Sequence, residues 1–263
     1  MRFDGQTVVL SGAGQGLGAT LARRFAEAGG NLVLAARTAG SLDGPVAAVQ
    51  AAGGVALAVE TDIADPDAAE RLAETAMARF GRIDILVNAA FPNQPRASVA
   101  EMDRAALERW RRTVEVGGYG TLLASRFVAP HMIAAGRGAI VNITSMSSRA
   151  GYAGRSDYGA GKAQAHLIAH VLADELGPHG IRVNSVAPGH IRSDKLDAFY
   201  RGLAVREGKS FEQVLAEHSA EMALRRIVTN DEVANAVLFL ASDLASGITG
   251  AVLDVNAGHR FAP

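Results

Sequence analysis

Short apolar segments recur along the chain, and longer segments of mixed polarity separate them. The apolar segments are rich in β-branched or aliphatic side chains and lie at 7–10, 31–35, 55–59, 83–88, 139–143, 182–186 and 251–255. None alternates cleanly between polar and apolar positions, as a strand with one solvent-exposed face would. The pattern therefore predicts strands that are covered on both faces, as in a parallel sheet.

Helix-length segments fill the intervals between these strands, at 17–28, 67–80, 102–127, 159–176 and 232–240. Strand and helix in regular alternation predict an α/β fold, a Rossmann-like doubly wound parallel sheet of about seven strands with helices on both faces. No repeat or linker interrupts the pattern, so we expect residues 1–263 to form a single domain. Residues 191–227 are a mostly helical insertion, either a packed hairpin or a mobile substrate lid, and the two can coincide.

Composition narrows the class of protein. The chain is 49% hydrophobic with a net charge of −1, which argues against a disordered chain and against nucleic-acid binding. The arginines at 109, 111 and 112 are expected to form a solvated helix face. Without cysteine there is no disulfide or thiolate nucleophile. No apolar segment approaches the ~18 residues of a membrane span and no leader pattern opens the chain, so a soluble cytoplasmic protein is expected.

A glycine-rich segment follows the first strand and opens a helix, in the order Ser11-Gly12-Ala13-Gly14-Gln15-Gly16-Leu17-Gly18. Glycines there let the backbone turn sharply and approach a pyrophosphate, whose charge the helix N-terminus attracts. A tight turn without a ligand is the simpler alternative. The position between strand and helix favours a dinucleotide site.

The end of the second strand bears on the choice of cofactor. An acid that could bind the ribose hydroxyls of NAD is missing there, and Arg37 follows two alanines. An arginine suits a 2′-phosphate, so we expect NADP in preference to NAD, although Arg37 could also be an ordinary surface residue. Asp62, followed by Ile63, comes just after the third strand, where its carboxylate could accept a hydrogen bond from the adenine amino group.

Tyr158 and Lys162 are four residues apart at the start of a helix, so their side chains share one face. A neighbouring ammonium favours the phenolate and is expected to move the tyrosine pKa toward neutrality. Lysine can also bond the ribose hydroxyls of a nicotinamide cofactor. Ser145 ends a predicted strand, where its hydroxyl could hold a substrate oxygen beside the phenol.

These residues, in this order and spacing, resemble the short-chain dehydrogenase/reductase family over essentially the full length of the chain. The resemblance implies that Tyr158 is the general acid/base, that Lys162 lowers its pKa and binds ribose, and that Ser145 positions the carbonyl. It also implies that 188–193 embraces the nicotinamide, and that the chain forms a homotetramer or homodimer through the helices carrying Tyr158 and residues 102–127. The residues expected to bind the cofactor are Gly12, Gln15, Gly16, Leu17, Gly18, Arg37, Asp62, Ile63, Asn88, Ala89, Ala90, Tyr158, Lys162, Pro188, Gly189, Ile191 and Ser193.

Two positions depart from the family pattern. Gly117 stands where the family usually has an asparagine that supports a helix kink and a proton-relay water. Glycine can keep the kink but cannot hold the water through a side chain, so we expect the relay to differ. Phe91 follows Asn88-Ala89-Ala90 in place of a glycine, and its ring is expected either near the substrate pocket or in the core.

The function predicted from these observations is reversible hydride transfer between NAD(P) and a small-molecule carbonyl or alcohol. A cofactor-binding sensor or scaffold with weakened catalysis is an alternative, for which Gly117 is the sequence support. A lyase or epimerase that uses the cofactor transiently is another. No metal is expected: His166 and His170 are spaced like zinc ligands, but we favour packing or a subunit contact. The sequence does not identify the substrate.

Overall fold

The computed structural model describes residues 1–92 and 95–259. Within them, seven strands form one parallel sheet in the order β3-β2-β1-β4-β5-β6-β7. The strands are β1 (Thr7–Ser11), β2 (Asn31–Ala36), β3 (Ala56–Glu60), β4 (Ile85–Asn88), β5 (Gly138–Ile143), β6 (Ile181–Pro188) and β7 (Val252–Val255). The order reverses beside β1, because the chain builds outward to β3 and then returns to place β4 on the other side of β1. This switch point is where open α/β sheets bind ligands.

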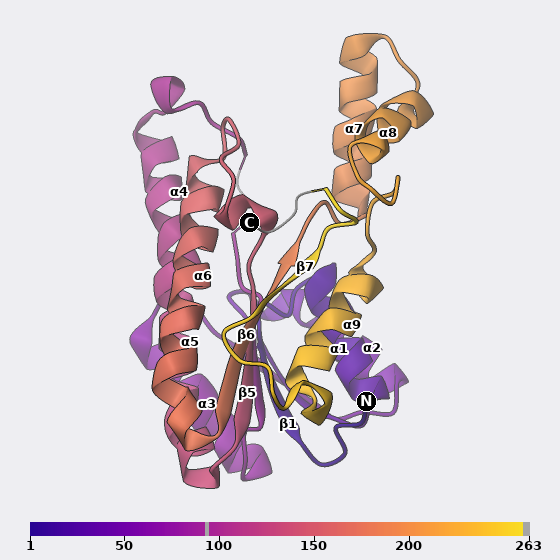
Figure 1. Ribbon diagram of the computed structural model, residues 1–263. Helices are drawn as coiled ribbons and strands as arrows, with labels where there is room; N and C mark the ends of the chain where they lie inside the picture. Colours follow the sequence, from indigo (N-terminus) through magenta and orange to yellow (C-terminus); the bar gives the residue numbers. More distant parts are fainter. Residues whose placement is uncertain (93–94, 260–263) are drawn as a thin grey trace.

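Helices cover both faces of the sheet (Figure 1). One layer holds α1 (Leu17–Glu27), α2 (Asp43–Ala51) and α9 (Asn230–Ala241); the other holds α3 (Pro66–Phe80), α4 (Arg104–Val114), α5 (Gly120–Ala135) and α6 (Ser156–Leu176). Each layer has its own core: Leu21, Phe25 and Val237 pack on one side, and Leu72, Val128 and Leu172 on the other. The predicted doubly wound α/β fold is confirmed.

Central strands are apolar at successive positions because both faces are covered. In β1, Val8 and Leu10 enter one core while Val9 enters the other, and all three are fully buried. All four residues of β4 are buried as well. Burial on both faces explains why the sequence shows continuous apolar segments where a half-exposed strand would alternate.

The helix expected over 102–127 is longer than predicted and has an irregular centre. α4 runs into a π-helical segment, Glu115–Tyr119, and α5 then continues to Ala135 with Pro130 inside it. Proline removes one helical hydrogen bond, but packing of α5 on the sheet keeps the helix intact beyond it. The π segment contains Gly117, and such segments are a recognised cause of bends in helices.

The insertion expected over 191–227 contains two helices, α7 (Asp194–Glu207) and α8 (Phe211–Ala220), which project beyond the carboxyl ends of the strands (Figure 1). The two helices pack as a hairpin, in which Tyr200 of α7, Val214 of α8 and Met222, just after α8, are buried. The packed-hairpin interpretation therefore describes the observed arrangement. Among the residues described, no helix is long and apolar enough to cross a membrane.

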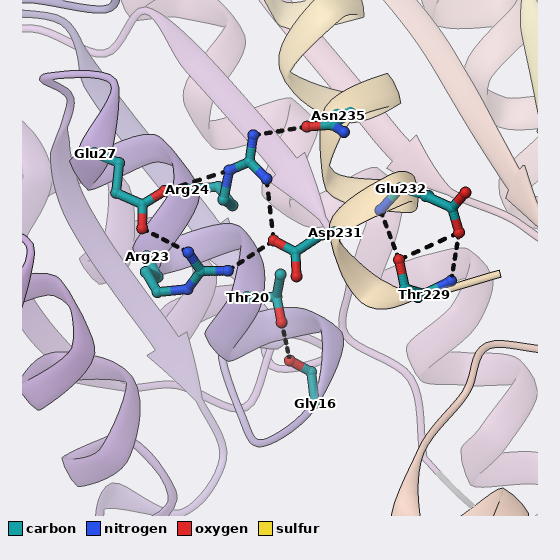
Figure 2. Close-up of polar contacts among 9 residues, drawn as sticks. All are labelled: Gly16, Thr20, Arg23, Arg24, Glu27, Thr229, Asp231, Glu232 and Asn235. Carbon is teal, nitrogen blue, oxygen red and sulfur yellow. Dashed lines mark hydrogen bonds and ion pairs between the residues drawn. The ribbon is translucent and has the colours of Figure 1, made fainter.

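Polar contacts fasten α9 to α1 (Figure 2). Asp231 accepts hydrogen bonds from Arg23 at 2.7 Å and Arg24 at 3.0 Å, and Arg24 also reaches Asn235 at 2.7 Å. At the start of α9, Thr229 and Glu232 form a capping box, in which each side chain accepts from the backbone N–H of the other residue. These contacts fix the layer that carries the glycine-rich loop.

Candidate active site

The glycine-rich loop at the end of β1 is closely packed. A Cβ at Gly12 would lie 2.4 Å from the backbone nitrogen of Ala90, and one at Gly18 would lie 2.4 Å from the carbonyl oxygen of Gly12. Gly12 also has a φ of +79°, and Gly16 one of +83°, which side chains disfavour. The sequence therefore needs glycine here both for conformation and for close approach of the backbone.

A cleft opens from this loop along the carboxyl ends of β2, β3 and β4. Of the residues expected to bind cofactor, it is lined by Gly12, Gln15, Leu17, Gly18, Arg37, Asp62, Ile63, Ala89 and Ala90. The first turn of α1 carries no acidic side chain, and the space around Gly14 and Gly16 is open. A helix N-terminus that faces the cleft without a carboxylate in its own first turn fits the phosphates of a dinucleotide.

Asn88 is buried within the fold next to the cleft. Its amide nitrogen donates to the Asn142 side-chain oxygen at 2.9 Å and to the Ser125 hydroxyl at 3.3 Å, and its amide oxygen accepts from Ser11 at 3.4 Å. The side chain thus ties β4 to β1, β5 and α5. In the structure Asn88 therefore holds the strand ends together, and its side chain is not among the cleft-lining residues.

Arg112 was missed as a cleft residue by the sequence analysis, which placed the whole arginine run on a solvated face. Arg111 does lie at the surface with 63% of its side chain exposed, but Arg112 lines the cleft and donates a short hydrogen bond to Asp62. Burial raises the pKa of Asp62, yet the hydrogen bonds from Arg112 and the Ala64 N–H, with the charge of Arg37, hold that pKa below its ordinary value. Asp62 therefore stays ionised between two cations.

The three catalytic candidates meet at the end of β5. Ser145 follows that strand and its Oγ accepts from the Ser147 N–H at 3.1 Å. Tyr158 lies in the first turn of α6, and the Ser145 hydroxyl is close enough to lower the pKa of the tyrosine hydroxyl. Lys162, one turn later, is only 5% exposed, and its Nζ donates to the Ile143 carbonyl at 2.6 Å. β5 and α6 thus bring the predicted residues together.

Electrostatics at this site differ from the expectation in one respect. Burial raises the pKa of the Tyr158 hydroxyl, and the Ser145 hydrogen bond and the Arg155 charge lower it by less. Burial also lowers the pKa of Lys162 to about 7. The Lys162 ammonium bonds the Ile143 carbonyl and lies 6.0 Å from the centroid of the Tyr158 ring, so it does not bring the phenol toward neutrality as expected.

Phe91 contacts this site directly. Its ring centroid lies 4.9 Å from that of Tyr158, with the planes at 71°, and Phe91 also lines the cleft. The ring fills the space beside Gly117: a Cβ there would lie 2.8 Å from Phe91 Cε2. The ring near the pocket is therefore the correct alternative, and the two departures from the family pattern are in contact with each other.

The predicted nicotinamide loop follows β6 at some distance along the sheet from β1. Pro188 ends that strand, the Gly189 N–H donates to the Val255 carbonyl at 3.0 Å, and Ile191 bridges to Val228. Ser193 caps α7 by accepting from the Leu196 N–H at 3.2 Å. The loop thus joins the sheet to the hairpin at the same sheet edge as the cleft.

His166 and His170 lie side by side on α6, with ring centroids 4.7 Å apart. Burial, followed by the charge of His170, lowers the pKa of His166. No group of three or more histidines or carboxylates that could hold a metal ion is found in residues 1–92 and 95–259. The pair therefore forms a ring contact on one helix.

Comparison with known proteins shows what the whole chain is similar to. The family model described as enoyl-(acyl carrier protein) reductase matches residues 12–260. The chain is 37% identical to cis-4-hydroxycyclohexanecarboxylate dehydrogenase of Sinomonas cyclohexanicum over 98% of this chain and 97% of that one. It is 35% identical to 1,6-dihydroxycyclohexa-2,4-diene-1-carboxylate dehydrogenase of Acinetobacter baylyi, with 98% of each chain covered.

Among solved structures, 7α-hydroxysteroid dehydrogenase complexed with NADH and 7-oxo glycochenodeoxycholic acid superposes with a TM-score of 0.84. The identity is 33%, and the match covers 98% of this chain and 95% of that one. The family model spans nearly the whole chain, and both curated relatives are dehydrogenases aligned over almost their full length. The chain belongs to the short-chain dehydrogenase/reductase family and is an NAD(P)-dependent oxidoreductase.

Proposed function

We propose that Tyr158 gives its hydroxyl proton to the carbonyl oxygen of the substrate during reduction and takes a proton back during alcohol oxidation. The observation that carries the proposal is that Tyr158 and Ser145 meet at the end of β5, where Ser145 lowers the Tyr158 pKa, with the buried Lys162 one turn away. When bound, the nicotinamide cofactor supplies or accepts the hydride. Ser145 holds the substrate oxygen, and Lys162 donates to the cofactor ribose. The raised pKa of Tyr158 keeps its proton in place at neutral pH.

The test replaces only the phenol hydroxyl. We expect Tyr158→Phe to lose about 100-fold or more in carbonyl reduction, the scale typical of a missing general acid, while still binding cofactor by fluorescence titration. Tyr119→Phe, at the exposed end of the π-helical segment before α5, is the matched control. If Tyr158→Phe reduces carbonyls at the normal rate, the assigned acid is wrong. If the parent chain binds cofactor but turns over no substrate, the sensor alternative replaces the enzyme.

For the cofactor we propose NADP. Arg37, Thr38 and Ser41 line the cleft at the end of β2, and no Asp or Glu among the described lining residues follows that strand; the lining carboxylate, Asp62, follows β3. An arginine with two hydroxyls suits a 2′-phosphate. Arg37→Ala should weaken NADPH binding about tenfold or more and change NADH binding less, as measured in paired titrations. Tighter binding of NADH by the parent chain would favour NAD, the dinucleotide type named for the solved hydroxysteroid dehydrogenase.

For the substrate we propose a cyclic secondary alcohol, or the matching ketone, that carries a carboxylate. Two of the relatives are named for hydroxylated ring carboxylates, and the solved hydroxysteroid dehydrogenase holds a bile acid. Two arginines border the site here: the Arg155 guanidinium lies 5.2 Å from the Tyr158 ring centroid, and that of Arg96 lies 5.6 Å from the Phe199 ring. Guanidinium groups are well suited to binding carboxylates.

Arg96 offers the sharper test because it lies on the loop before α4, outside the acid–base residues. We expect Arg96→Ala to raise the KM for 4-oxocyclohexanecarboxylate several-fold and to leave the KM for cyclohexanone unchanged, because only the first substrate carries a charge. Arg104→Ala, on the exposed start of α4, is the control. Equal effects on both ketones would remove Arg96 from carboxylate recognition.

We also propose that the α7–α8 hairpin closes over the substrate. Phe199 of α7 is 42% exposed and its ring packs against Arg96, so the hairpin already contacts the loop after β4. Closure of such an element excludes water from a hydride-transfer site. Phe199→Ala should raise KM for ketones, while Val205→Ala, at an 84% exposed position on the same helix, should not.

Assembly into a homotetramer or homodimer is a further part of the proposal. α5 and α6 expose large apolar side chains, including Leu122, Leu167 and Val171, on neighbouring helices. Apolar patches on a surface otherwise rich in charge favour contact with a second copy of the chain. Light scattering should give a dimer or tetramer for the parent chain, and Leu167→Glu should shift it toward monomer.

A further inference from the structure

Phe91 lies where three segments of the chain meet beside the proposed catalytic residues. It follows β4, while Gly117 belongs to the π-helical segment before α5, and Gly161 belongs to α6 between Tyr158 and Lys162. The helix pair α4 and α6 and the π segment pack closely against each other. Phe91 therefore reaches into a contact between helices from the strand side of the site.

Two glycines make room for its ring. A Cβ at Gly117 would lie 2.8 Å from Phe91 Cε2, closer than carbon atoms can approach without movement. A Cβ at Gly161 would lie 3.0 Å from Cε2 and 3.2 Å from Cζ of the same ring. Neither glycine has a positive φ, so their backbone conformations do not call for glycine. The Phe91 ring is one reason why neither position carries a side chain; a Cβ at Gly117 would also lie 3.0 Å from Gly161 Cα, and one at Gly161 would lie 3.3 Å from the Thr113 carbonyl oxygen.

The ring occupies this space with one face toward Lys162. The lysine Nζ lies 4.3 Å from the Phe91 ring centroid, and the same Nζ donates to the Ile143 carbonyl at 2.6 Å. The negative face of an aromatic ring attracts an ammonium, more strongly when both are withdrawn from water. Lys162 is almost fully buried, so the ring and the carbonyl replace part of the water that the ammonium loses.

We propose that Phe91 is a positioning residue for Lys162: its ring face holds the lysine ammonium one helical turn from Tyr158, in a space that Gly117 and Gly161 leave open. The contact is a property of the chain itself and is measurable without cofactor. Its meaning for catalysis rests on the role proposed above for Lys162. Two opposite consequences follow, because the ring both attracts the ammonium and keeps water away from it.

Attraction and exclusion of water shift the Lys162 pKa in opposite directions. Phe91→Leu keeps most of the apolar volume but removes the ring face, so the charged form loses its partner and the pKa should fall below about 7, by up to about one unit. Phe91→Ala opens the space to water, so the pKa should rise toward the ordinary lysine value. If the Phe91 ring only filled space, the Lys162 pKa would not fall in Phe91→Leu.

The chain suits a direct measurement because its lysines are only Lys162, Lys195 and Lys209. Lysine labelled with carbon-13 at Cε gives one signal for each, and Lys195→Arg and Lys209→Arg assign them. Titrating the cofactor-free protein by NMR then follows Lys162 itself. The titratable side chain that it faces is Tyr158 on its own helix; β5 offers the Ile143 carbonyl and the loop after β4 offers the Phe91 ring, both uncharged.

We expect a lower Lys162 pKa in Phe91→Leu and a higher one in Phe91→Ala, and the same value as the parent in the control Phe80→Leu on α3. A value in Phe91→Leu equal to or above that of the parent overturns the proposal. As a second measurement, Gly117→Ala should lower the urea midpoint of unfolding in the parent, and lower it less in the Phe91→Ala background, where the ring is gone and only the Gly161 backbone remains close. Equal losses in both backgrounds also overturn it. These experiments need no turnover, so their failure is separate from failure of Tyr158→Phe.

Discussion

At the scale of single residues, the site contains a costly group. Lys162 is buried with its charge facing a carbonyl and a ring, and no carboxylate contributes to the shift of its pKa. Burial of an ammonium without a counter-ion opposes folding, because the charged form loses its water. Such groups persist where function needs them. The burial of Lys162 therefore lowers the stability of the fold, at a position where the proposed role in cofactor binding needs its charge.

Lys162→Met should therefore stabilise the protein and abolish turnover. The folded pKa of about 7 lies below the ordinary value of 10.5, so the unfolded chain binds the extra proton between those values. The free energy of unfolding of the parent accordingly rises with pH across this window. The parent is therefore least stable relative to Lys162→Met below pH 7. We expect about 1–4 kcal/mol of added stability at pH 7 by urea unfolding, fading toward pH 10. Lys195→Met, at an exposed position, should change neither quantity; a less stable Lys162→Met would contradict the argument.

How far the site could be predicted depends on whether its residues are close in sequence. Tyr158 and Lys162 share one helical face, and Ser145 ends a strand, so local patterns were enough to name them. Arg112 looked like part of a solvated run because its partner Asp62 is distant in sequence. The contact of Phe91 with Gly117 likewise depends on how a loop meets a helix, which no periodicity encodes.

At the scale of elements, strands were the most predictable part. Their continuous apolar segments follow directly from burial on both faces, and the observed strands differ from prediction by one or two residues at their ends. Helix ends depended on packing: α5 passes Pro130 and reaches Ala135 because it lies on the sheet, whereas proline in isolation suggests an earlier end. α2 was not among the predicted helices, since its short, alanine-rich sequence shows weak periodicity.

The capping box of α9 supports a prediction at this scale (Figure 2). Thr229 Oγ1 accepts from the Glu232 N–H at 3.2 Å, and Glu232 Oε2 accepts from the Thr229 N–H at 2.8 Å. Thr229→Ala removes the hydroxyl that bonds both the Glu232 N–H and the Glu232 carboxylate. We expect the free energy of unfolding in urea to fall by about 1 kcal/mol. Thr229→Ser should recover most of the loss. Asp231→Ala, which removes half-exposed ion pairs to α1, should cost less than Thr229→Ala; the reverse order would show that the ion pairs hold α9 more strongly than its cap.

At the scale of the whole molecule, one cluster of rings joins the sheet to the hairpin and to the end of the described chain. His190 follows β6, and its Nδ1 lies 3.1 Å from the Tyr200 hydroxyl of α7. Its ring also meets that of His259 at 5.3 Å, while His218 of α8 stacks on Tyr200 at 4.8 Å. One partly buried cluster therefore contains side chains from four segments: the loop after β6, α7, α8 and the segment after β7. Its protonation affects how the hairpin is held to the sheet.

Acid should loosen this junction through His190. Burial, then the charges of His259 and His218, lowers the His190 pKa to about 4, below the ordinary 6.5, so the folded protein holds this ring neutral. Between pH 6.5 and 4 the unfolded chain takes up a proton that the folded chain excludes, and the stability of the protein therefore falls as the pH falls through this window. At pH 5 the exclusion of this proton from His190 lowers the free energy of unfolding by about 2 kcal/mol. Urea unfolding at pH 7.5 and pH 5 should show this. On acidification, His190→Asn should lose about 2 kcal/mol less free energy of unfolding than the parent does. The exposed His179→Asn should lose as much as the parent, because its ring lies outside the cluster. Equal losses in His190→Asn and the parent would place the acid sensitivity of the molecule outside this junction.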